Sequence, residues 1–125
     1  MREIKFRGRS KREWAYGMPV FYKESALIED RNPNTSVMRS IWVNPESIGQ
    51  YTGMKDRNGK EIYEGDIVRY RDPDFDEFAI GEVIYYSVTC SFVVAKDILE
   101  ITALLSMCEY EVIGNIHDNP DLLKS

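Results

Sequence analysis

Residues 50–70 read QYTGMKDRNGKEIYEGDIVRY, and this stretch holds the strongest local structural signals in the chain. Asn58-Gly59 is the pair favoured in tight hairpin turns, because both residues tolerate a positive φ. Gly65 marks a second tight turn a few residues later. Asn58, Gly59 and Gly65 are therefore interpreted as structural turn residues, and the apolar residues beside them predict short antiparallel strands.

The same β pattern continues toward the N-terminus. Residues 4–7 alternate apolar and charged side chains, as a half-buried strand does. In residues 14–22, large apolar side chains recur at every second position: Trp14, Tyr16, Met18, Val20 and Tyr22. Because side chains two residues apart lie on the same face of a strand, residues 1–23 predict a β-hairpin with one aromatic face. Gly17 and Pro19 indicate a bulge or an edge position in it.

Further strands are expected after residue 70. Residues 78–86, 91–95 and 110–116 are rich in β-branched and aromatic residues. Residues 97–108 are ambiguous: their apolar side chains recur with a helical period and indicate a short helix, but Ile and Thr are poor helix formers, so whether the segment is helical stays open. The residues 119–121, Asn-Pro-Asp, predict at most a short C-terminal helix.

The number and spacing of these segments indicate the fold class. Roughly seven or eight short strands, with turns about every eight to twelve residues, are typical of small all-β domains. We expect a mainly β fold, either a small SH3-like barrel or a compact sandwich, with an added N-terminal β-hairpin layer and at most one or two short helices. The 125 residues are expected to form one domain, with residues 1–50 as the N-terminal layer and 51–125 as a barrel-like core.

The charge distribution limits the partners that we expect. The formal net charge is −5, but residues 1–13 hold six basic and two acidic side chains, a local balance of +4. The remaining residues then carry −9, which argues against a dedicated DNA-binding protein. No apolar run is long enough to span a membrane, and the first residues lack the apolar segment of a signal peptide, so we expect a cytoplasmic protein.

Five blocks of the sequence carry a resemblance to a known family. They are MREIKFRG at 1–8, WAYG at 14–17, IGQYTGMKDRNGKEIYEGDIVRY at 48–70, GEV at 81–83 and EVIGNIHDNPDLL at 111–123. In this order they resemble the YopX family of phage and prophage proteins. The resemblance implies a phage or prophage origin, a bacterial host cell and a mostly β fold. It implies no known activity, and no catalytic residue can be carried over from it.

The residues offer little for catalysis or metal binding. The acidic residues 72–77 lack a calcium loop's pattern, because Glu77 and Val83 stand where that loop needs Gly and Glu. His117 is the only histidine, and only Asp118 accompanies it, whereas a metal centre or general base usually has more companions. No nucleophile elbow and no phosphate-binding loop occurs. We therefore expect no enzyme, no metal and no cofactor.

Two classes of binding function remain open. The first is a non-catalytic protein-interaction module, either a host-modulating phage accessory protein or a homo-oligomer. Its docking loop would consist of Gln50, Tyr51, Thr52, Met54 and Lys55, which the turn glycines do not explain. An interface requires these side chains to be exposed together, whereas inward packing would make them part of a core.

The second class is a nucleic-acid-binding small β-barrel that uses the basic N-terminal strand. The candidate contacts with phosphates and bases are Arg7, Arg9, Lys11, Arg12, Trp14 and Tyr16. In the competing interpretation the aromatic residues are core and the charges keep an edge strand soluble. The remainder of the chain is acidic and repels nucleic acid. Our first choice of partner is therefore a host protein, a phage protein or a second copy of the chain, and nucleic acid is the second choice. We expect no membrane partner, and the sequence identifies no small-molecule substrate.

Overall fold

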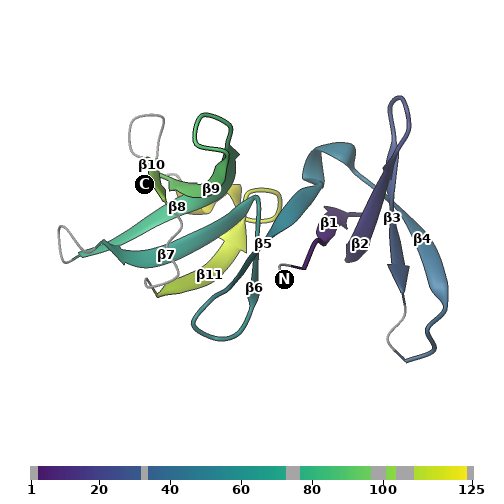
Figure 1. Cartoon of the computed structure of the whole chain (residues 1–125), viewed down its shortest axis with the longest axis horizontal. Helices are drawn as coiled ribbons and strands as arrows, with labels where there is room; N and C mark the ends of the chain where they lie inside the picture. Colours follow the sequence, from purple (N-terminus) through teal and green to yellow (C-terminus); the bar gives the residue numbers. More distant parts are fainter. Residues whose placement is uncertain (1–2, 32–33, 73–76, 97–100, 104–108, 124–125) are drawn as a thin grey trace. The chain divides into compact units, whose positions relative to one another are not determined.

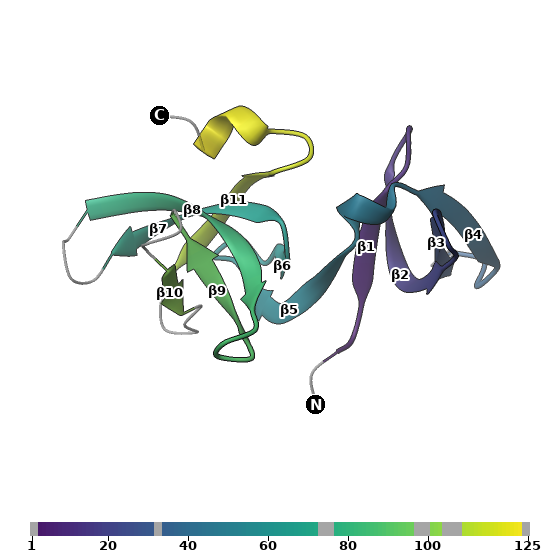
Figure 2. The same cartoon turned by 90° about the horizontal axis from the view of Figure 1, so that it is seen from above.

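The computed structural model describes residues 3–31, 34–72, 77–96, 101–103 and 109–123 (Figure 1). The chain divides into two compact units, Met1–Tyr51 and Thr52–Ser125. Each unit is built from antiparallel strands, and the two views in Figures 1 and 2 allow each to be followed separately. The expectation that the whole chain forms one domain stays a prediction.

The first unit is an antiparallel meander. Its strands are β1 (Phe6–Arg9), β2 (Trp14–Phe21), β3 (Ala26–Arg31) and β4 (Met38–Val43), followed by the short 3₁₀ helix η1 (Pro45–Ser47). Strand β5 (Gly49–Lys55) begins in this unit beside β1, and the hydrogen-bonded order is β4-β3-β2-β1-β5. Each of the first four strands pairs with its neighbour in sequence, because the connections between them are short.

The register of this sheet separates its side chains into two faces. Gly8 lies opposite Ala15, and Phe21 lies opposite Ala26. Because Ala15 and Phe21 are an even number of residues apart on β2, all four residues belong to one face. That face is the core of the unit: Ala15, Ala26, Ile28 and Val43 are buried, with Phe6, Ile41 and Ile48 packed against them. The side chains of the alternate positions therefore point to the other face.

The sheet curls until the end of β4 returns to β1. The backbone N–H of Asn44 donates to the carbonyl oxygen of Arg9 at 2.9 Å. At the same place a Cβ added to Gly8 would lie 2.8 Å from Val43 Cγ2, closer than side-chain contacts allow. Glycine at position 8 therefore allows β1 and the end of β4 to approach each other across the core face.

The second unit holds the remaining strands. After the second half of β5 they are β6 (Glu61–Tyr63), β7 (Asp66–Asp72), β8 (Glu77–Tyr86), β9 (Ser91–Ala95), β10 (Ile101–Ala103) and β11 (Tyr110–Asn115), and the 3₁₀ helix η2 (Pro120–Leu123) follows. Strands β10-β9-β8-β7-β11 form a five-stranded sheet in that order, and β6 lies beside β5. The buried core consists of Ile62, Val68, Tyr70, Ala79, Val83, Val94 and Tyr110.

The stretch at 50–70 owes its geometry to its turns. Gly53, Gly59 and Gly65 all have a positive φ, between 83° and 93°. Gly59 therefore has the conformation predicted for the Asn58-Gly59 turn, and Gly65 connects β6 to β7. The Asp66 carboxylate, which is buried, accepts the backbone N–H of Tyr63 at 2.8 Å across this second turn.

The expected mainly β fold is confirmed, and the two helices in the described residues are short 3₁₀ turns. Of the two expected architectures, the SH3-like barrel is not formed, because neither antiparallel sheet is closed; two open sheets are compatible with a sandwich. The sequence left open whether residues 97–108 form a helix, and within them Ile101–Ala103 form a strand instead. The rest of that segment lies outside the described residues.

Candidate functional site

Strand β5 places most of the expected docking loop inward rather than outward. Tyr51 and Thr52 are buried, and the Thr52 hydroxyl donates to the carbonyl oxygen of Ile62 at 2.8 Å. Met54 is half-buried and packs against the core of the second unit. Gln50 is half-buried, and only Lys55 is exposed. The joint exposure that an interface at Gln50, Tyr51, Thr52, Met54 and Lys55 requires is therefore not met.

The basic residues of β1 are largely covered by their own sheet. Arg7 is only 4% exposed, and its guanidinium lies 4.5 Å from the centre of the Trp14 ring. Lys5 Nζ lies 5.6 Å from the centre of the Tyr51 ring. Such cation–π contacts hold the charged groups against the sheet. Arg7 therefore belongs to the structure of the sheet and is not presented to a phosphate.

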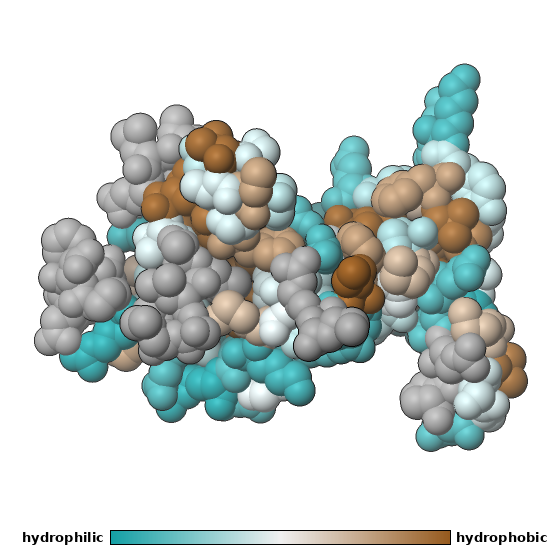
Figure 3. All heavy atoms as spheres, in the orientation of Figure 1, coloured by the Kyte–Doolittle hydropathy of each residue, from teal (hydrophilic) through white to brown (hydrophobic). Residues whose placement is uncertain are grey.

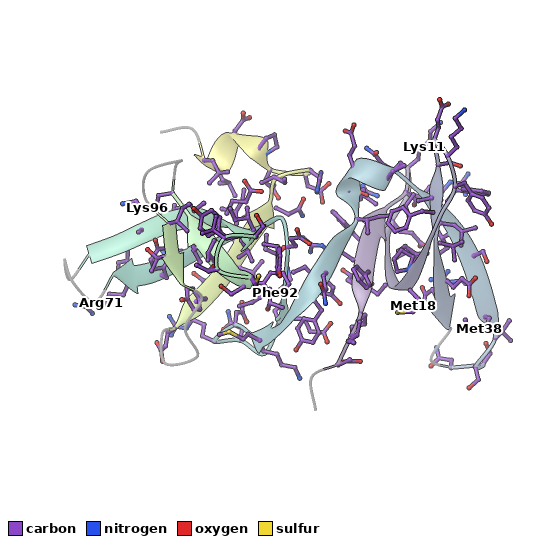
Figure 4. The ribbon with its side chains drawn as sticks, turned by 45° about the horizontal axis from the view of Figure 1, so that its top comes forward. Lys11, Met18, Met38, Arg71, Phe92 and Lys96 are labelled. Atoms are coloured by element: carbon purple, nitrogen blue, oxygen red, sulfur yellow. The ribbon has the colours of Figure 1, made fainter. Side chains whose placement is uncertain are left out.

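The turn between β1 and β2 presents its charges differently. The Ser10 hydroxyl accepts the backbone N–H groups of Arg12 and Glu13 at 3.2 and 3.0 Å, which fixes the turn. Lys11 and Arg12 are exposed at its tip, where Figure 4 labels Lys11. Neither side chain has an ion-pair partner among the described residues. Arg9, at the base of the turn, is half-buried and donates to the carbonyl oxygen of Ser10 at 2.8 Å.

We define the outer face as the side of the β1–β4 sheet opposite the core of the first unit. The register places Tyr16 on it opposite Arg7, and Trp42 on it opposite Leu27. Five of its large apolar side chains are between 43% and 60% exposed: Tyr16, Met18, Tyr22, Met38 and Trp42. Tyr22 and Trp42 form a ring pair with centroids 5.6 Å apart. The outer face is therefore an aromatic and methionine-rich surface open to solvent.

Figure 3 shows tan and brown side chains beside teal ones on the surface of the first unit. In Figure 4, Met18 and Met38 lie toward the end of the sheet that is remote from Lys11. The outer face thus has a basic turn at one end and methionines toward the other. The Glu29 side chain belongs to the same face, because Glu29 lies opposite Met18.

A hollow lies beside this face, between the β1–β2 turn and β4. Two adjoining depressions of about 490 and 500 Å³ form it, and both contain Ser10, Lys11 and Trp42. The first is also lined by Arg12, Glu13 and Ile41, the second by Arg9, Val43 and Asn44. Trp42 therefore borders both the outer face and a depression with basic side chains.

The two units carry opposite charge. Residues 1–51 have nine basic and six acidic side chains, a net charge of +3. Residues 52–125 have seven basic and fifteen acidic side chains, a net charge of −8. The outer face therefore lies on the basic part of an acidic protein.

Two titratable groups of the second unit bear on the predictions about sites. His117 is exposed, and its backbone N–H donates to the Asn115 side chain at 3.0 Å within a turn. Burial raises the pKa of Glu82, and the neighbouring charge of Glu64 raises it further. Within the described part of the chain, no three His, Cys, Asp or Glu side chains lie close enough to hold a metal ion. None of its helices is long and apolar enough to cross a membrane.

The sequence indicated the aromatic face of residues 14–22 but missed Trp42 and Met38 as members of it. The available signal was the run Ser40-Ile41-Trp42-Val43, which is β-branched and aromatic and so typical of a strand. Which neighbouring strand Trp42 would join could not be inferred, because that depends on the pairing of β3 with β4.

Comparisons with known proteins give the family and the fold. The crystal structure of protein EF1440 from Enterococcus faecalis is similar over 99% of this chain and 100% of that chain, with 26% identity and a TM-score of 0.58. A search of curated proteins found no match. The model of the family described as "YopX protein" matches residues 5–124. The resemblance seen in the five sequence blocks is thereby confirmed, and the chain belongs to the YopX family.

Proposed function

We propose that the chain is a non-catalytic, phage- or prophage-encoded accessory protein that binds another protein in the bacterial cytoplasm. The surface that it uses is the outer face rather than the loop at residues 50–55. Membership of the YopX family supports the phage or prophage origin, and the similar protein from a bacterium is consistent with a bacterial host. A role without catalysis is supported by the sequence, which lacks nucleophile and phosphate-loop motifs.

One observation carries this proposal, namely the exposure of five large apolar side chains on a single sheet face. Scattered exposed apolar residues are ordinary on protein surfaces, but a contiguous group marks an interaction site. Tyr, Trp, Met and Arg are the residue types enriched at protein interfaces. Aromatic side chains also lose little conformational entropy on binding, so they serve well as anchors. The composition of the outer face therefore fits a protein partner.

Nucleic acid is the second candidate partner, and a specific observation favours it. Lys5, Arg7 and Arg9 alternate along residues 5–9, beside the rings of Tyr51, Trp14 and Tyr16. Interleaved basic and aromatic side chains are a feature of single-strand-binding surfaces. Burial of Arg7 weighs against nucleic acid, because a buried guanidinium cannot contact a phosphate.

The first experiment is affinity capture from a lysate of a bacterium that carries the gene, with quantitative mass spectrometry. The test variant combines Met18→Ser and Trp42→Ser on the outer face. The matched control combines Phe78→Ser and Val88→Ser, which are exposed apolar residues of the second unit. We expect the test variant to lose the captured partner and the control to retain it. Sedimentation of both variants detects the case in which the partner is a second copy.

The proposal fails if the outer-face variant captures the same proteins as the unaltered chain, or if no partner and no self-association are found. Fluorescence anisotropy with labelled single- and double-stranded DNA and RNA separates the two candidate classes. Binding that rests on phosphate contacts weakens steeply with salt, because it depends on counterion release. Salt-sensitive binding that Lys11→Ala and Arg12→Ala abolish would favour nucleic acid as the partner.

A further inference from the structure

We propose that the hollow between β4 and the β1–β2 turn binds an extended acidic peptide segment of the protein partner, which adds to β4 as a further strand. This inference deepens the proposed function and rests on it, since Trp42 borders both surfaces. It names the chemistry of the bound segment, namely acidic side chains on an extended backbone.

The edge of β4 is open to strand addition. Strand β4 is the first in the order β4-β3-β2-β1-β5, so only β3 pairs with it. Among the described residues, no backbone hydrogen bond is made from the outer edge of Met38–Val43. The next residue, Asn44, bonds to Arg9 and closes one end of the hollow. An unpaired row of N–H and C=O groups is a template for an added strand, and such addition is a recurring mode of peptide recognition.

The charges at the hollow select an acidic segment. Lys11 and Arg12 line it, are exposed, and have no ion-pair partner among the described residues. Cations on this rim attract a partner of opposite charge and disfavour a basic one. Ile41 and Trp42 line the same hollow, so an added strand also meets apolar surface.

One ion pair joins β4 to Glu13, which lines the hollow. Arg39 Nη1 lies 3.5 Å from Glu13 Oε1, and both side chains are about half exposed, at 50% and 47%. Arg39 also bonds to Asp30 at 2.9 Å on its own sheet, so it keeps a partner if Glu13 moves away. Exposed ion pairs contribute little stability, which means that an entering strand displaces this contact at small cost.

The probe is a fluorescein-labelled peptide of about ten alternating Glu and Val residues, long enough to span the six residues of β4. Fluorescence anisotropy with the full chain measures its binding at moderate salt. The control peptide has Lys in place of Glu. We expect the acidic peptide to bind and the basic one not to bind. Binding of both peptides alike, or of neither up to about millimolar protein, overturns the proposal.

The matched variants are Lys11→Glu and Lys23→Glu. Both lysines are exposed in tight turns of the same sheet, but only Lys11 lines the hollow. We expect Lys11→Glu to weaken binding about threefold or more, and the Lys11→Glu/Arg12→Glu double variant roughly tenfold, given the usual strength of exposed charge pairs. Lys23→Glu is expected to bind as the unaltered chain does. Equal effects of Lys11→Glu and Lys23→Glu would show only long-range attraction and overturn the assignment of the hollow.

Two N-methylated peptides test strand addition itself. In an antiparallel pair the N–H groups of alternate residues point to the same neighbour. Methylation of every Val nitrogen or of every Glu nitrogen therefore removes the donors on one side only. We expect one of these peptides to lose binding and the other to keep it. If both keep binding, the peptide does not add to β4.

Two experiments together distinguish failure of the peptide site from failure of the proposed function: peptide binding to the unaltered chain, and partner capture by the Met18→Ser/Trp42→Ser variant. If Met18→Ser/Trp42→Ser loses its captured partner while the acidic peptide fails to bind the unaltered chain, the outer face remains an interface and the hollow is not its peptide site. If the acidic peptide binds with the expected charge dependence and no partner depends on the outer face, the proposed function is wrong in its choice of surface.

Discussion

The carboxylate of Asp56 organises the turn that the sequence marks with Asn58-Gly59. Its Oδ1 accepts the backbone N–H groups of Asn58 and Lys60 at 2.8 and 2.9 Å, and its Oδ2 accepts that of Val112 at 3.0 Å. Burial by itself would raise the pKa of this carboxyl, but the three backbone hydrogen bonds and the charge of Lys60 lower it below the ordinary value of 3.8. One side chain thus fixes a local turn and ties it to β11.

We predict that Asp56→Asn destabilises the protein by about 1–2 kcal/mol at neutral pH, because an amide NH₂ replaces one of the two accepting oxygens. The folded pKa is lowered, so the stability that the carboxylate contributes is present above its ordinary pKa of 3.8. It is lost as the pH falls through the lower, folded pKa. The difference between Asp56→Asn and the unaltered chain should therefore shrink in strongly acidic buffer.

Urea unfolding at neutral and acidic pH measures this effect. The control is Glu109→Gln, which removes one exposed carboxylate from the same unit. If Asp56→Asn lowers the free energy of unfolding by no more than the control does, the Asp56 carboxylate does not organise the turn.

At the scale of elements, the packing of β2 on β3 depends on Gly17. An added Cβ would lie 2.0 Å from the carbonyl oxygen of Glu29, which is backbone and cannot turn aside. The sequence predicted a bulge or an edge position near Gly17, but β2 lies between β1 and β3 and no register shift occurs in its pairing with either strand. The close approach of the two backbones accounts for the glycine. Strands β2 and β3 can keep their present geometry only without a side chain at position 17.

We predict that Gly17→Ala destabilises the chain by about 2 kcal/mol or more, since the two strands must move apart to admit the methyl group. Thermal unfolding followed by circular dichroism measures the loss. Gly59→Ala is a useful comparison, because a Cβ there meets nothing within 4 Å and strains only the positive φ. We expect it to cost about 1 kcal/mol. A smaller cost for Gly17→Ala than for Gly59→Ala would be inconsistent with the close approach of β2 and β3.

The two faces of the β1–β4 sheet should also differ in their response to truncation. Ile28 is fully buried on the core face, whereas Met18 is 52% exposed on the outer face. We predict that Ile28→Ala costs about 2–5 kcal/mol of unfolding free energy, because it leaves a cavity. Met18→Ala should stay within about 0.5 kcal/mol of the unaltered chain. Urea unfolding of both variants checks this, and similar costs would mean that the outer face is covered.

For the whole molecule, two hydrophobic cores are set in two units of opposite charge. The core of the first unit and that of the second have no residue in common. We predict that a mutation in one core acts mainly on its own unit. Amide hydrogen exchange of Ile28→Ala should show faster exchange in β1–β4, with little change in β7–β9. Val83→Ala, in the other core, should show the opposite pattern. Uniformly faster exchange in either variant would show that the two units open together.

The charge difference between the units also bears on function at this scale. A net charge of +3 on residues 1–51 and −8 on residues 52–125 gives the chain a strong asymmetry that its overall value of −5 conceals. An acidic partner is attracted to the first unit and repelled by the second, which restricts how it can approach. This asymmetry is consistent with an acidic segment as the occupant of the hollow beside β4.

The sequence by itself determined the turns at Asn58-Gly59 and Gly65, most of the strands, the shared face of Trp14, Tyr16 and Met18, and the family. These features depend on residues close together in the chain, on backbone conformation at single positions and on an alternation with period two. Only the tertiary structure decided which face of each strand is covered. Alternation groups side chains on one face but does not say whether that face meets a core or water. Three placements depended on the tertiary structure for this reason. Tyr51 and Thr52 are buried, and Arg7 lies over the ring of Trp14. Trp42 joins the face of β2 through long-range strand pairing.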